Sequence, residues 1–381
     1  MSSILAIQRE DVVVRELVAA IEVTMPVSRV PWRSPIASML GERLLRPTTG
    51  RIATPAGRVI AKSLALVTAA GLAVAAGSAV RGGWPSRAAG SPRLTSRRAV
   101  LATSPDQADL VASMSGPRFY HAIDDFTEYA WASARVLAAE RRIVDGCRAV
   151  FAVSNALAET LCERHGLSRD RVIVVPNGVP ADMIPADVPR PHLRRDEPAE
   201  RSLPIAGVLG SLSSRLRLDW LRQVVDATPW LSWRFVGGIE EAELAPGDRF
   251  HLRWLEQHPR CRFEGPRPYR DLVRYATLLD VAVMPYSDRI TNASGSPTRL
   301  FTHLAAGHPM LATPGCPQIE ELAGSLVTTC EGPETLVTAL EGLRDRRFDD
   351  GLHRARWEAA HRHTWAERAR VILDTIHATV A

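Results

Sequence analysis

The sequence predicts an α/β protein with two parallel-sheet domains that face a cleft. Three observations lead to this expectation: apolar strand segments alternate with helix segments, the alternation runs through each half of the chain, and a proline-rich stretch separates the halves. Such alternation is typical of parallel sheets covered by helices on both faces. Because ligands bind at the carboxyl ends of parallel strands, two facing sheets predict a ligand cleft between them.

Residues 1–178 are expected to form the amino-terminal domain. A first strand and helix are indicated by SSILAI and REDVVVRELVAAI, whereas residues 26–56 show no clear element. The later segments have the lengths and apolar content of buried strands and their helices. They are AVLATSP, DQADLVASM, RFYHAID, DGCRAVFAVSNALAETLCERHG (which ends near Gly166) and RVIVVPNGV.

Residues 176–204 have the character of an interdomain connection. They contain seven prolines and many charges, without an apolar period. The alternation then restarts, which predicts a second domain over 205–360. Its expected elements are the strands PIAGVLGS, WRFVGG, CRFEG, DVAVMPY and PMLATP and the helices LRLDWLRQVVDAT, YRDLVRYATLL and PTRLFTHLAA.

The composition excludes a disordered or fibrous chain, since 46% of the 381 residues are hydrophobic. Five cysteines form no C-x-x-C pair and have no histidine at zinc spacing, so we expect neither a disulfide framework nor a metal site. The amino terminus lacks the basic-then-apolar order of a secretion signal. These features predict a cytoplasmic protein.

The first hundred residues are basic. They carry 14 Lys and Arg against 5 Asp and Glu, a net charge of +9, whereas the rest of the chain carries 33 against 37, a net charge of −4. Such a charge suits a nucleic acid, an anionic membrane surface or a phosphorylated substrate, and a general preference for arginine explains it equally well. Because no aromatic residues are interleaved with these arginines, we expect no nucleic-acid partner.

An uncharged segment, residues 63–80, has the minimum length of a membrane span. Its alanines, glycines and hydroxyl residues are only weakly apolar, which favours a buried helix. A span, or a helix that touches the bilayer surface, stays an alternative. With the basic charge around it, the segment predicts peripheral attachment at the inner face of a membrane.

The stretch SGSPTRLFTHLAAGHPMLATP, residues 294–314, predicts an anion site. It follows the strand DVAVMPY, so its helix starts at the carboxyl edge of the sheet. Ser296 fits the N-cap and Pro297 the first helical position. Thr298 and Arg299 then offer free backbone N–H groups and a guanidinium to a phosphate pair, although many such helix starts bind nothing. Gly307 and Pro309 are expected to end the helix.

A glycine turn lies at the start of the same domain. Gly210 and Ser211 come directly after the strand PIAGVLGS and before a helix, where the backbone can approach a ligand closely. A plain strand-to-helix turn is the alternative.

These features together resemble the GT-B glycosyltransferases, with two Rossmann-like domains, of the group 1 or family 4 type, including bacterial exopolysaccharide glycosyltransferases. The resemblance covers roughly residues 115–375. VVPNGV resembles the passage between the domains, and GVLGSLSS resembles the glycine loop on the donor side. CRFEGPRPYRDL is similar to the segment that meets the nucleobase. SPTRLFTHLAAGHPMLATP is similar to the segment that holds the donor diphosphate. The donor-binding residues that the resemblance implies are Gly210, Ser211, Gly265, Pro266, Tyr286, Ser296, Pro297, Thr298 and Arg299.

The resemblance implies transfer of a sugar from a nucleotide-diphosphate sugar, with a UDP-sugar expected, to a glycan, a lipid-linked acceptor or a small molecule. It also implies that the last helix, within residues 361–381, crosses back to the first domain. Many relatives carry two glutamates at the positions of Ser294 and Thr302, and the second usually contacts the donor ribose. A hydroxyl can still bond to a ribose, but the change keeps two alternatives open: an inactive partner subunit that docks to another enzyme, and a sugar-nucleotide epimerase.

The candidate catalytic groups lie in RFYHAIDDFTEY, at the end of a strand of the first domain. Transfer with inversion needs a carboxylate or imidazole to take the proton of the acceptor hydroxyl. Asp124 is the first candidate, by the resemblance to a segment of similar spacing in polysaccharide transferases, and His121 is the second. Helix capping is the alternative role, above all for Asp125. We expect Arg299 and the helix end, rather than a metal ion, to neutralise the leaving diphosphate, and no cofactor beyond the donor.

Overall fold

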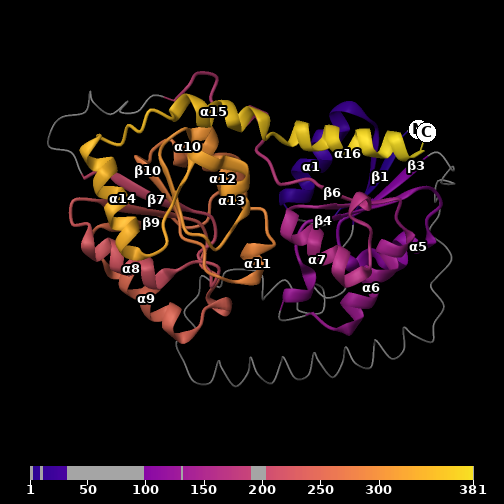
Figure 1. Cartoon of the computed structure of the whole chain (residues 1–381), viewed down its shortest axis with the longest axis horizontal. Coiled ribbons are helices and arrows are strands. Elements are labelled where there is room, and N and C mark those ends of the chain that lie inside the picture. The colour runs from indigo at the N-terminus through magenta and orange to yellow at the C-terminus, as the bar shows by residue number, and fades with distance from the viewer. Residues whose placement is uncertain (1–2, 9–11, 32–97, 130–131, 190–202, 381) are drawn as a thin grey trace.

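The computed structural model describes residues 3–8, 12–31, 98–129, 132–189 and 203–380. Two parallel sheets stand side by side along the long axis of the molecule, each flanked by helices, as Figure 1 shows. The predicted α/β class with two facing sheets is confirmed. The uncharged segment 63–80 lies outside the described residues, so its alternatives stay open.

The first sheet has the strand order β2-β1-β3-β4-β5-β6, with every neighbouring pair parallel. Its described helices are α1 (Val12–Thr24), α5 (Ala108–Ser113), α6 (Ala134–Gly146) and α7 (Asn155–His165). The strand β2 falls inside the range 26–56, where the sequence indicated no element. Its five residues end in proline, which suits an edge strand. The strands are β1 (Ser3–Gln8), β2 (Val27–Pro31), β3 (Arg98–Ala102), β4 (Arg118–Ala122), β5 (Ala149–Ala152) and β6 (Val172–Val174).

The second sheet has the order β12-β11-β10-β7-β8-β9 and is also parallel. Its strands are β7 (Ile205–Leu209), β8 (Ser232–Val236), β9 (Cys261–Phe263), β10 (Val281–Met284), β11 (Met310–Ala312) and β12 (Thr328–Thr329). Its helices are α8 (Leu218–Ala227), α9 (Pro246–Gln257), α10 (Leu272–Ala276), α11 (Ile290–Ala293), α12 (Thr298–Ala306), α13 (Gln318–Ala323), α14 (Pro333–Asp345) and α15 (His353–Arg362).

The strands at the centre of each sheet are buried on both faces, as helix layers on both sides require. In the first domain Phe119 and Phe151 are fully buried and stack with ring centroids 6.4 Å apart. In the second, Trp233 and Phe235 stack in the same way. The strands in AVLATSP and PIAGVLGS therefore appear in the sequence as apolar runs, because neither face of these strands meets water.

Helix α12 is the element that places the expected anion site. It begins at Thr298, with Pro297 as its N-cap, one residue later than the sequence predicted, and Ser296 does not cap it. Gly307 ends the helix in the left-handed conformation, with φ 76° and its N–H donating to the carbonyl of His303, as predicted. Every residue of α12 from Leu300 to Ala306 is buried, so the helix is held rigidly in the domain.

The chain crosses between the domains twice, at adjacent places. The N–H of Val179 donates to the carbonyl of His363, and the N–H of Trp365 donates to the carbonyl of Val179. A Cβ on Gly178 would lie 2.9 Å from the His363 oxygen, so only glycine lets the two crossings come this close.

The last helix, α16 (Trp365–Val380), lies along α1 of the first domain, far from the sheet of the domain that precedes it (Figure 1). Trp365, Ile372 and Ile376 pack there in one apolar cluster with Leu17 and Phe119. The predicted crossing of the carboxyl-terminal helix is confirmed. Within the described part of the chain, none of the helices combines the length and the apolarity that crossing a membrane demands.

Candidate functional site

A cavity of about 510 Å³ lies between the two domains, where strands β4, β7 and β10 end. Both domains contribute to its wall, as the parallel-sheet rule predicts. The first domain and the crossing supply Asp124, Phe126, Tyr129 and Asn177, and the second domain supplies Ser211, Arg215, Glu240, Glu243, Tyr286, Ser296, Pro297, Thr298 and Cys316.

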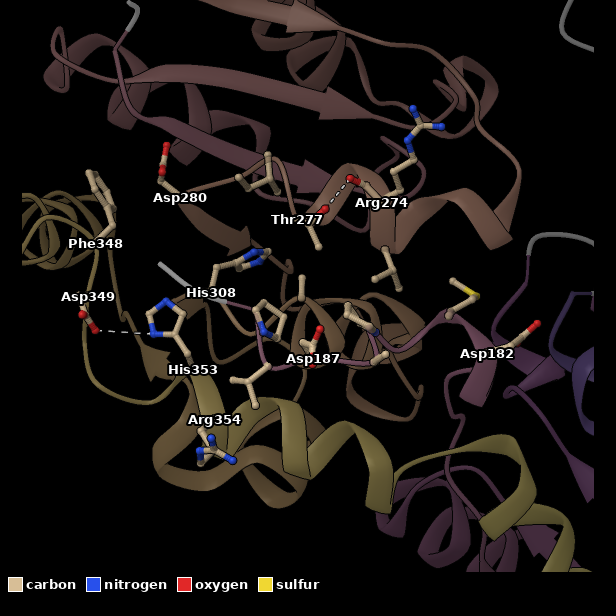
Figure 2. A pocket seen from close by; sticks show the side chains of 18 of the residues that line it. Asp182, Asp187, Arg274, Thr277, Asp280, His308, Phe348, Asp349, His353 and Arg354 are labelled. Atoms are coloured by element: carbon tan, nitrogen blue, oxygen red, sulfur yellow. Dashed lines mark hydrogen bonds and ion pairs between the residues drawn. The ribbon is translucent and has the colours of Figure 1, made fainter. Parts of the chain in front are cut away.

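A larger cavity, of about 1400 Å³, lies elsewhere on the second domain, between the interdomain connection, α10 and α15 (Figure 2). Figure 2 shows His308 and His353 pointing into it, with Asp187 on the connection nearby. Leu279 and Asp280, which line it, directly precede β10, so it opens at the amino ends of the strands. Ligands of open parallel sheets bind at the opposite edge, so the smaller cavity is the candidate functional site.

Of the predicted donor-binding residues, Ser211, Tyr286, Ser296, Pro297 and Thr298 line the cavity, whereas Gly210 and Arg299 do not line it and lie directly behind its wall. Nη2 of Arg299 donates to the carbonyl of Ser211 at 3.3 Å, and its guanidinium lies 5.0 Å from the centre of the Tyr286 ring. Gly210 has φ 90°, and a Cβ there would lie 2.8 Å from Arg299 Nη2. The positive φ favours glycine at this position, and a side chain there would also displace the Arg299 guanidinium.

Arg299 retains one donor that the described residues do not satisfy, because Nη1 is buried and has no hydrogen-bond partner among them. A buried guanidinium donor left unpaired is costly unless an anion reaches it. Arg299 belongs to the first turn of α12, where the positive end of the helix dipole adds to its charge. This end of the cleft is thus suited to a phosphate group.

Ser296 contacts the interdomain crossing instead of the helix. Its Oγ accepts from the N–H of Asn177 at 2.9 Å, while Nδ2 of Asn177 donates to the Ser296 carbonyl at 2.7 Å. Sequence reasoning did not single out Asn177, although it lies in VVPNGV. This pair of bonds ties the amino-terminal approach of α12 to the first domain.

The two positions at which relatives carry glutamate are turned away from the cleft. Ser294 is buried and its Oγ donates to the carbonyl of Ile290 at 2.9 Å. Thr302 is 1% exposed, and its hydroxyl lies 3.4 Å from the Thr298 carbonyl. Neither residue lines the cavity, so the ribose contact would have to come from other groups.

The predicted nucleobase segment lies next to the site but does not line it. Gly265, with φ 70°, accepts from the N–H of Gly237 at 3.0 Å, and Pro266 follows it after β9. Neither residue belongs to the wall of the cleft cavity. Their role in donor binding stays a prediction.

Asp124 is a carboxylate of the first domain that lines the cleft. Its Oδ1 accepts from the N–H of Asp125 at 3.0 Å, its Oδ2 accepts from the Tyr129 hydroxyl, and Oδ2 lies 3.9 Å from Nη2 of Arg215. Burial raises the pKa of Asp124, and the charge of Arg215 opposes this rise. A carboxylate with a raised pKa, held by two donors, is suited to accept a proton.

Asp125 has the structural role that the sequence left open for it. It is the N-cap of a short turn, Phe126–Glu128, and its Oδ1 accepts from the N–H of Thr127 at 3.1 Å. Its Oδ2 accepts from Arg164 at 2.7 Å. Although burial acts to raise the pKa of Asp125, the bond to Arg164 makes the net change a lowering.

His121 does not belong to this cluster, contrary to the expectation from RFYHAIDD. It lies inside β4, is 0% exposed, and packs edge-on to Phe151. Its Nε2 lies 3.4 Å from the carbonyl of Val175, and burial lowers its pKa to about 4. The alternation of a parallel strand that is buried on both faces places this side chain in the core. This placement argues against a catalytic role for His121, which stays an untested prediction.

Besides Asn177, the sequence analysis did not single out Tyr129 and Arg215, which also line the cleft. Tyr129 donates to Asp124 and Arg215 faces it from the second domain, and Nη2 of Arg215 also donates to the carbonyl of Thr291 at 2.8 Å. Tyr129 ends the same RFYHAIDDFTEY segment, and Arg215 follows the glycine turn in GVLGSLSSRLR, so both lay within segments that had been singled out. The described residues contain no group of three or more His, Cys, Asp or Glu side chains placed to hold a metal ion.

Comparison with known proteins finds similarity to glycosyltransferases. The family model for Glycosyltransferase Family 4 matches residues 118–183, from β4 to the start of the interdomain connection. TuaH of Bacillus subtilis, named as a teichuronic acid biosynthesis glycosyltransferase, is 22% identical over 232 residues. That match covers 60% of this chain and 57% of TuaH, so it spans little more than half of the relative.

Solved structures share the fold over longer stretches. Anabaena HepE, crystallised in complex with UDP-glucose, has a TM-score of 0.59 at 15% identity, covering 74% of this chain and 78% of HepE. A glycosyltransferase from Rickettsia africae has a TM-score of 0.59 at 13% identity, covering 99% of this chain and 98% of that one. The chain has the GT-B fold, and the resemblance expected from its sequence is confirmed.

Proposed function

We propose that the protein is a glycosyltransferase that moves a sugar from a UDP-sugar to an acceptor hydroxyl without a metal ion. The observation that supports this most is the arrangement of the cleft: a carboxylate of the first domain, Asp124, faces the start of α12 in the second domain across one cavity. Arg299 lies directly behind that wall of the cavity, bonded to the carbonyl of Ser211. The family match over 118–183 and the complex of HepE with UDP-glucose favour the same reaction and donor class.

On the donor side, Arg299 and the free N–H groups at the start of α12 would hold the diphosphate. The unpaired Nη1 of Arg299 supplies a donor for a phosphate oxygen. As the bond between the sugar and the diphosphate breaks, negative charge grows on the leaving group, and a fixed guanidinium and helix dipole stabilise it. This charge stabilisation takes the part that a metal ion has in other transferases.

On the acceptor side, Asp124 would act as the base. It takes the proton of the acceptor hydroxyl while that oxygen bonds to the anomeric carbon and the diphosphate leaves. Tyr129 and the Asp125 N–H hold the carboxylate in place during this step. The likeness to TuaH favours an acceptor in polysaccharide biosynthesis, either a glycan or a lipid-linked precursor, at the cytoplasmic face of the membrane.

A second candidate is an inactive subunit that retains the donor pocket and acts by docking to another enzyme. The observation that favours it is the pair Ser294 and Thr302, whose hydroxyls bond within their own helices and do not reach the cleft. A sugar-nucleotide epimerase is the third. It would bind the same donor and leave the acceptor side unused.

A thermal-shift screen of nucleotides and nucleotide sugars, followed by product analysis, tests the proposal. A ligand at 100 times its dissociation constant stabilises the folded state by about 2.7 kcal/mol. We expect stabilisation by UDP and UDP-sugars, and transfer or slow hydrolysis of one of them. Binding without turnover supports the inactive subunit, an isomerised nucleotide sugar supports the epimerase, and no nucleotide binding contradicts all three.

A further inference from the structure

A network of charged side chains leads from the core of the first domain to the turn that carries Asp124. Arg164, near the end of α7, donates from Nη2 to Asp125 at 2.7 Å and from Nη1 to Glu140 at 3.2 Å. The side chains of Asp125 and Glu140 are each 1% exposed. Two carboxylates buried this deeply need a cation between them, and Arg164 supplies it.

The core end of the network is fully bonded. Glu140 Oε1 accepts from the Tyr120 hydroxyl at 3.1 Å, and its Oε2 lies 2.9 Å from Nε2 of His165. Tyr120 belongs to β4 and Glu140 to α6, so these two elements converge here with α7. A satisfied buried network of this kind holds its members in one geometry. The position of Arg164 is therefore set by the core.

The other end of the network reaches the candidate base. The Asp125 carboxylate accepts from the N–H and from the hydroxyl of Thr127, at 3.1 and 2.7 Å, which fixes the turn. The N–H of Asp125 donates to Asp124 Oδ1 at 3.0 Å. The ionisable groups that face Asp124 are Asp125, Tyr129 and Arg215, and Arg164 does not line the cavity. The chain of contacts from Arg164 to Asp124 therefore runs through Asp125.

We propose that Arg164 is a positioning residue for Asp124. By pairing with Asp125, it holds the turn in the geometry in which the Asp125 N–H and the Tyr129 hydroxyl both donate to the Asp124 carboxylate. Its importance for turnover rests on the proposed function, whereas the coupling between Arg164 and Asp124 is a property of the folded chain and can be measured by itself.

The experiment measures the pKa of Asp124 by ¹³C NMR of the carboxyl carbon, with the signal assigned by its loss in Asp124→Asn. Arg164→Gln leaves the Asp125 carboxylate uncompensated beside Asp124, so we expect the pKa of Asp124 to rise by about one unit. Asp125→Asn removes that charge, so the pKa should fall. In the double variant, the pKa of Asp124 should equal its value in Asp125→Asn alone.

Arg141→Gln is the matched control. Arg141 also donates to α7, to the carbonyl of His165 at 3.0 Å, but it pairs with Asp145 and has no contact with Asp125. We expect it to leave the pKa of Asp124 unchanged. In an active parent, Arg164→Gln should lower kcat by about 10- to 100-fold with the donor KM unchanged, and Arg164→Lys should restore part of the loss.

An unchanged pKa of Asp124 in folded Arg164→Gln overturns the proposal. The proposal is also overturned if Arg164→Gln shifts the pKa of Asp124 by the same amount in the Asp125→Asn background as in the parent. Arg164 would then act on Asp124 by a route that does not include Asp125. If Arg164→Gln does not fold, the comparison of the double variant with Asp125→Asn decides alone. A parent that transfers no sugar contradicts the proposed function, and the titration still decides the positioning.

Discussion

Nη2 of Arg215, in the second domain, lies 3.9 Å from Oδ2 of Asp124, in the first. The two residues follow the carboxyl ends of β7 and β4, so the distance between them reports how far the two sheets have closed. Other bonds join the same edges: Ser154 Oγ donates to the carbonyl of Ser294 at 2.6 Å, and Asn177 bonds to Ser296. The two domains therefore contact each other directly at this edge of the cleft, with the proposed base facing the donor domain.

Arg215→Gln should raise the pKa of Asp124, because the charge of Arg215 lowers it in the parent. Since the base must be ionised, the acid limb of the kcat/KM profile should move to higher pH. The measurement is transfer rate against pH. Arg217→Gln is the control, because Arg217 pairs with Asp219 and Asp288 on the outer side of the same loop. An identical acid limb in Arg215→Gln and parent contradicts the assignment of Asp124 as the base.

Arg299→Ala should weaken the binding of UDP by about 1.5 to 3 kcal/mol, the contribution of hydrogen bonds to a charged group, and leave the fold intact. Titration calorimetry of UDP against parent and variant measures this. Arg274→Ala, an exposed arginine of α10 at the larger cavity, is the control and should bind as the parent does. Equal affinity in Arg299→Ala and the parent would remove Arg299 from the phosphate site.

Most of the fold could be predicted because the strands are buried on both faces and therefore read as apolar runs. The strand β2 could not, since VSRVP is short, partly charged and next to residues without a period. The bounds of α12 could be predicted because a proline favours the start of a helix and a glycine favours its end, and Pro297 and Gly307 occupy these places. The partner of Ser296 is Asn177, 119 positions earlier, and no local pattern indicates a bond over that distance.

The segment RFYHAIDD, which holds the candidate catalytic residues, could also be interpreted only in part from the sequence. Three polar residues, His121, Asp124 and Asp125, follow one another closely in RFYHAIDD, and local sequence does not tell which of them face the cleft. The strand register places His121 in the core, and the turn after β4 points Asp125 toward Arg164 and Asp124 toward the cavity. The partners that decide this, Arg164 and Arg215, come from elements far along the chain.

Asp350→Asn should destabilise the second domain at neutral pH by about 3 kcal/mol, because it leaves Arg356, which is 2% exposed, without its carboxylate. Arg356 Nη1 donates to Asp350 Oδ1 at 2.9 Å. Burial acts to raise the pKa of Asp350, and the bond to Arg356 lowers it on balance. A lowered folded-state pKa means that this stability is present above the unfolded pKa, near 3.9, and is lost as the pH falls through the folded value.

Urea unfolding of Asp350→Asn and parent between pH 7 and pH 3 measures this difference. Asp349→Asn, at the half-exposed neighbour, is the control and should change stability little. If the difference in the free energy of unfolding between Asp350→Asn and the parent stays constant down to pH 3, protonation of Asp350 does not remove the stability that its pair with Arg356 provides.

Membrane attachment should be loose and sensitive to salt, because the net charge of +9 in residues 1–100 attracts anionic lipid and is screened within about 8 Å at physiological ionic strength. Flotation with anionic vesicles at low and high salt measures this. Binding at low salt alone is expected and would fit a lipid-linked acceptor. A protein that stays with the unbound fraction in both conditions points to an acceptor that is a small molecule in solution.

Asp124→Asn should lower turnover by about 10²- to 10⁴-fold while the affinity for UDP barely changes. The amide keeps the size of the carboxylate, and its oxygen can still accept from Tyr129 or from the Asp125 N–H, so the turn should persist. It cannot take a proton from the acceptor. The measurement is kcat of the folded protein, together with UDP titration.

His121→Leu, which keeps the volume of a buried side chain, separates the two candidates, because a core residue can lose its ring nitrogens without loss of turnover by the folded fraction. If Asp124→Asn transfers sugar at the rate of the parent and His121→Leu is inactive, the base is the histidine after all. If both variants keep full activity, the proton goes to a group that neither residue supplies, and Asp124 only joins the two domains through Arg215.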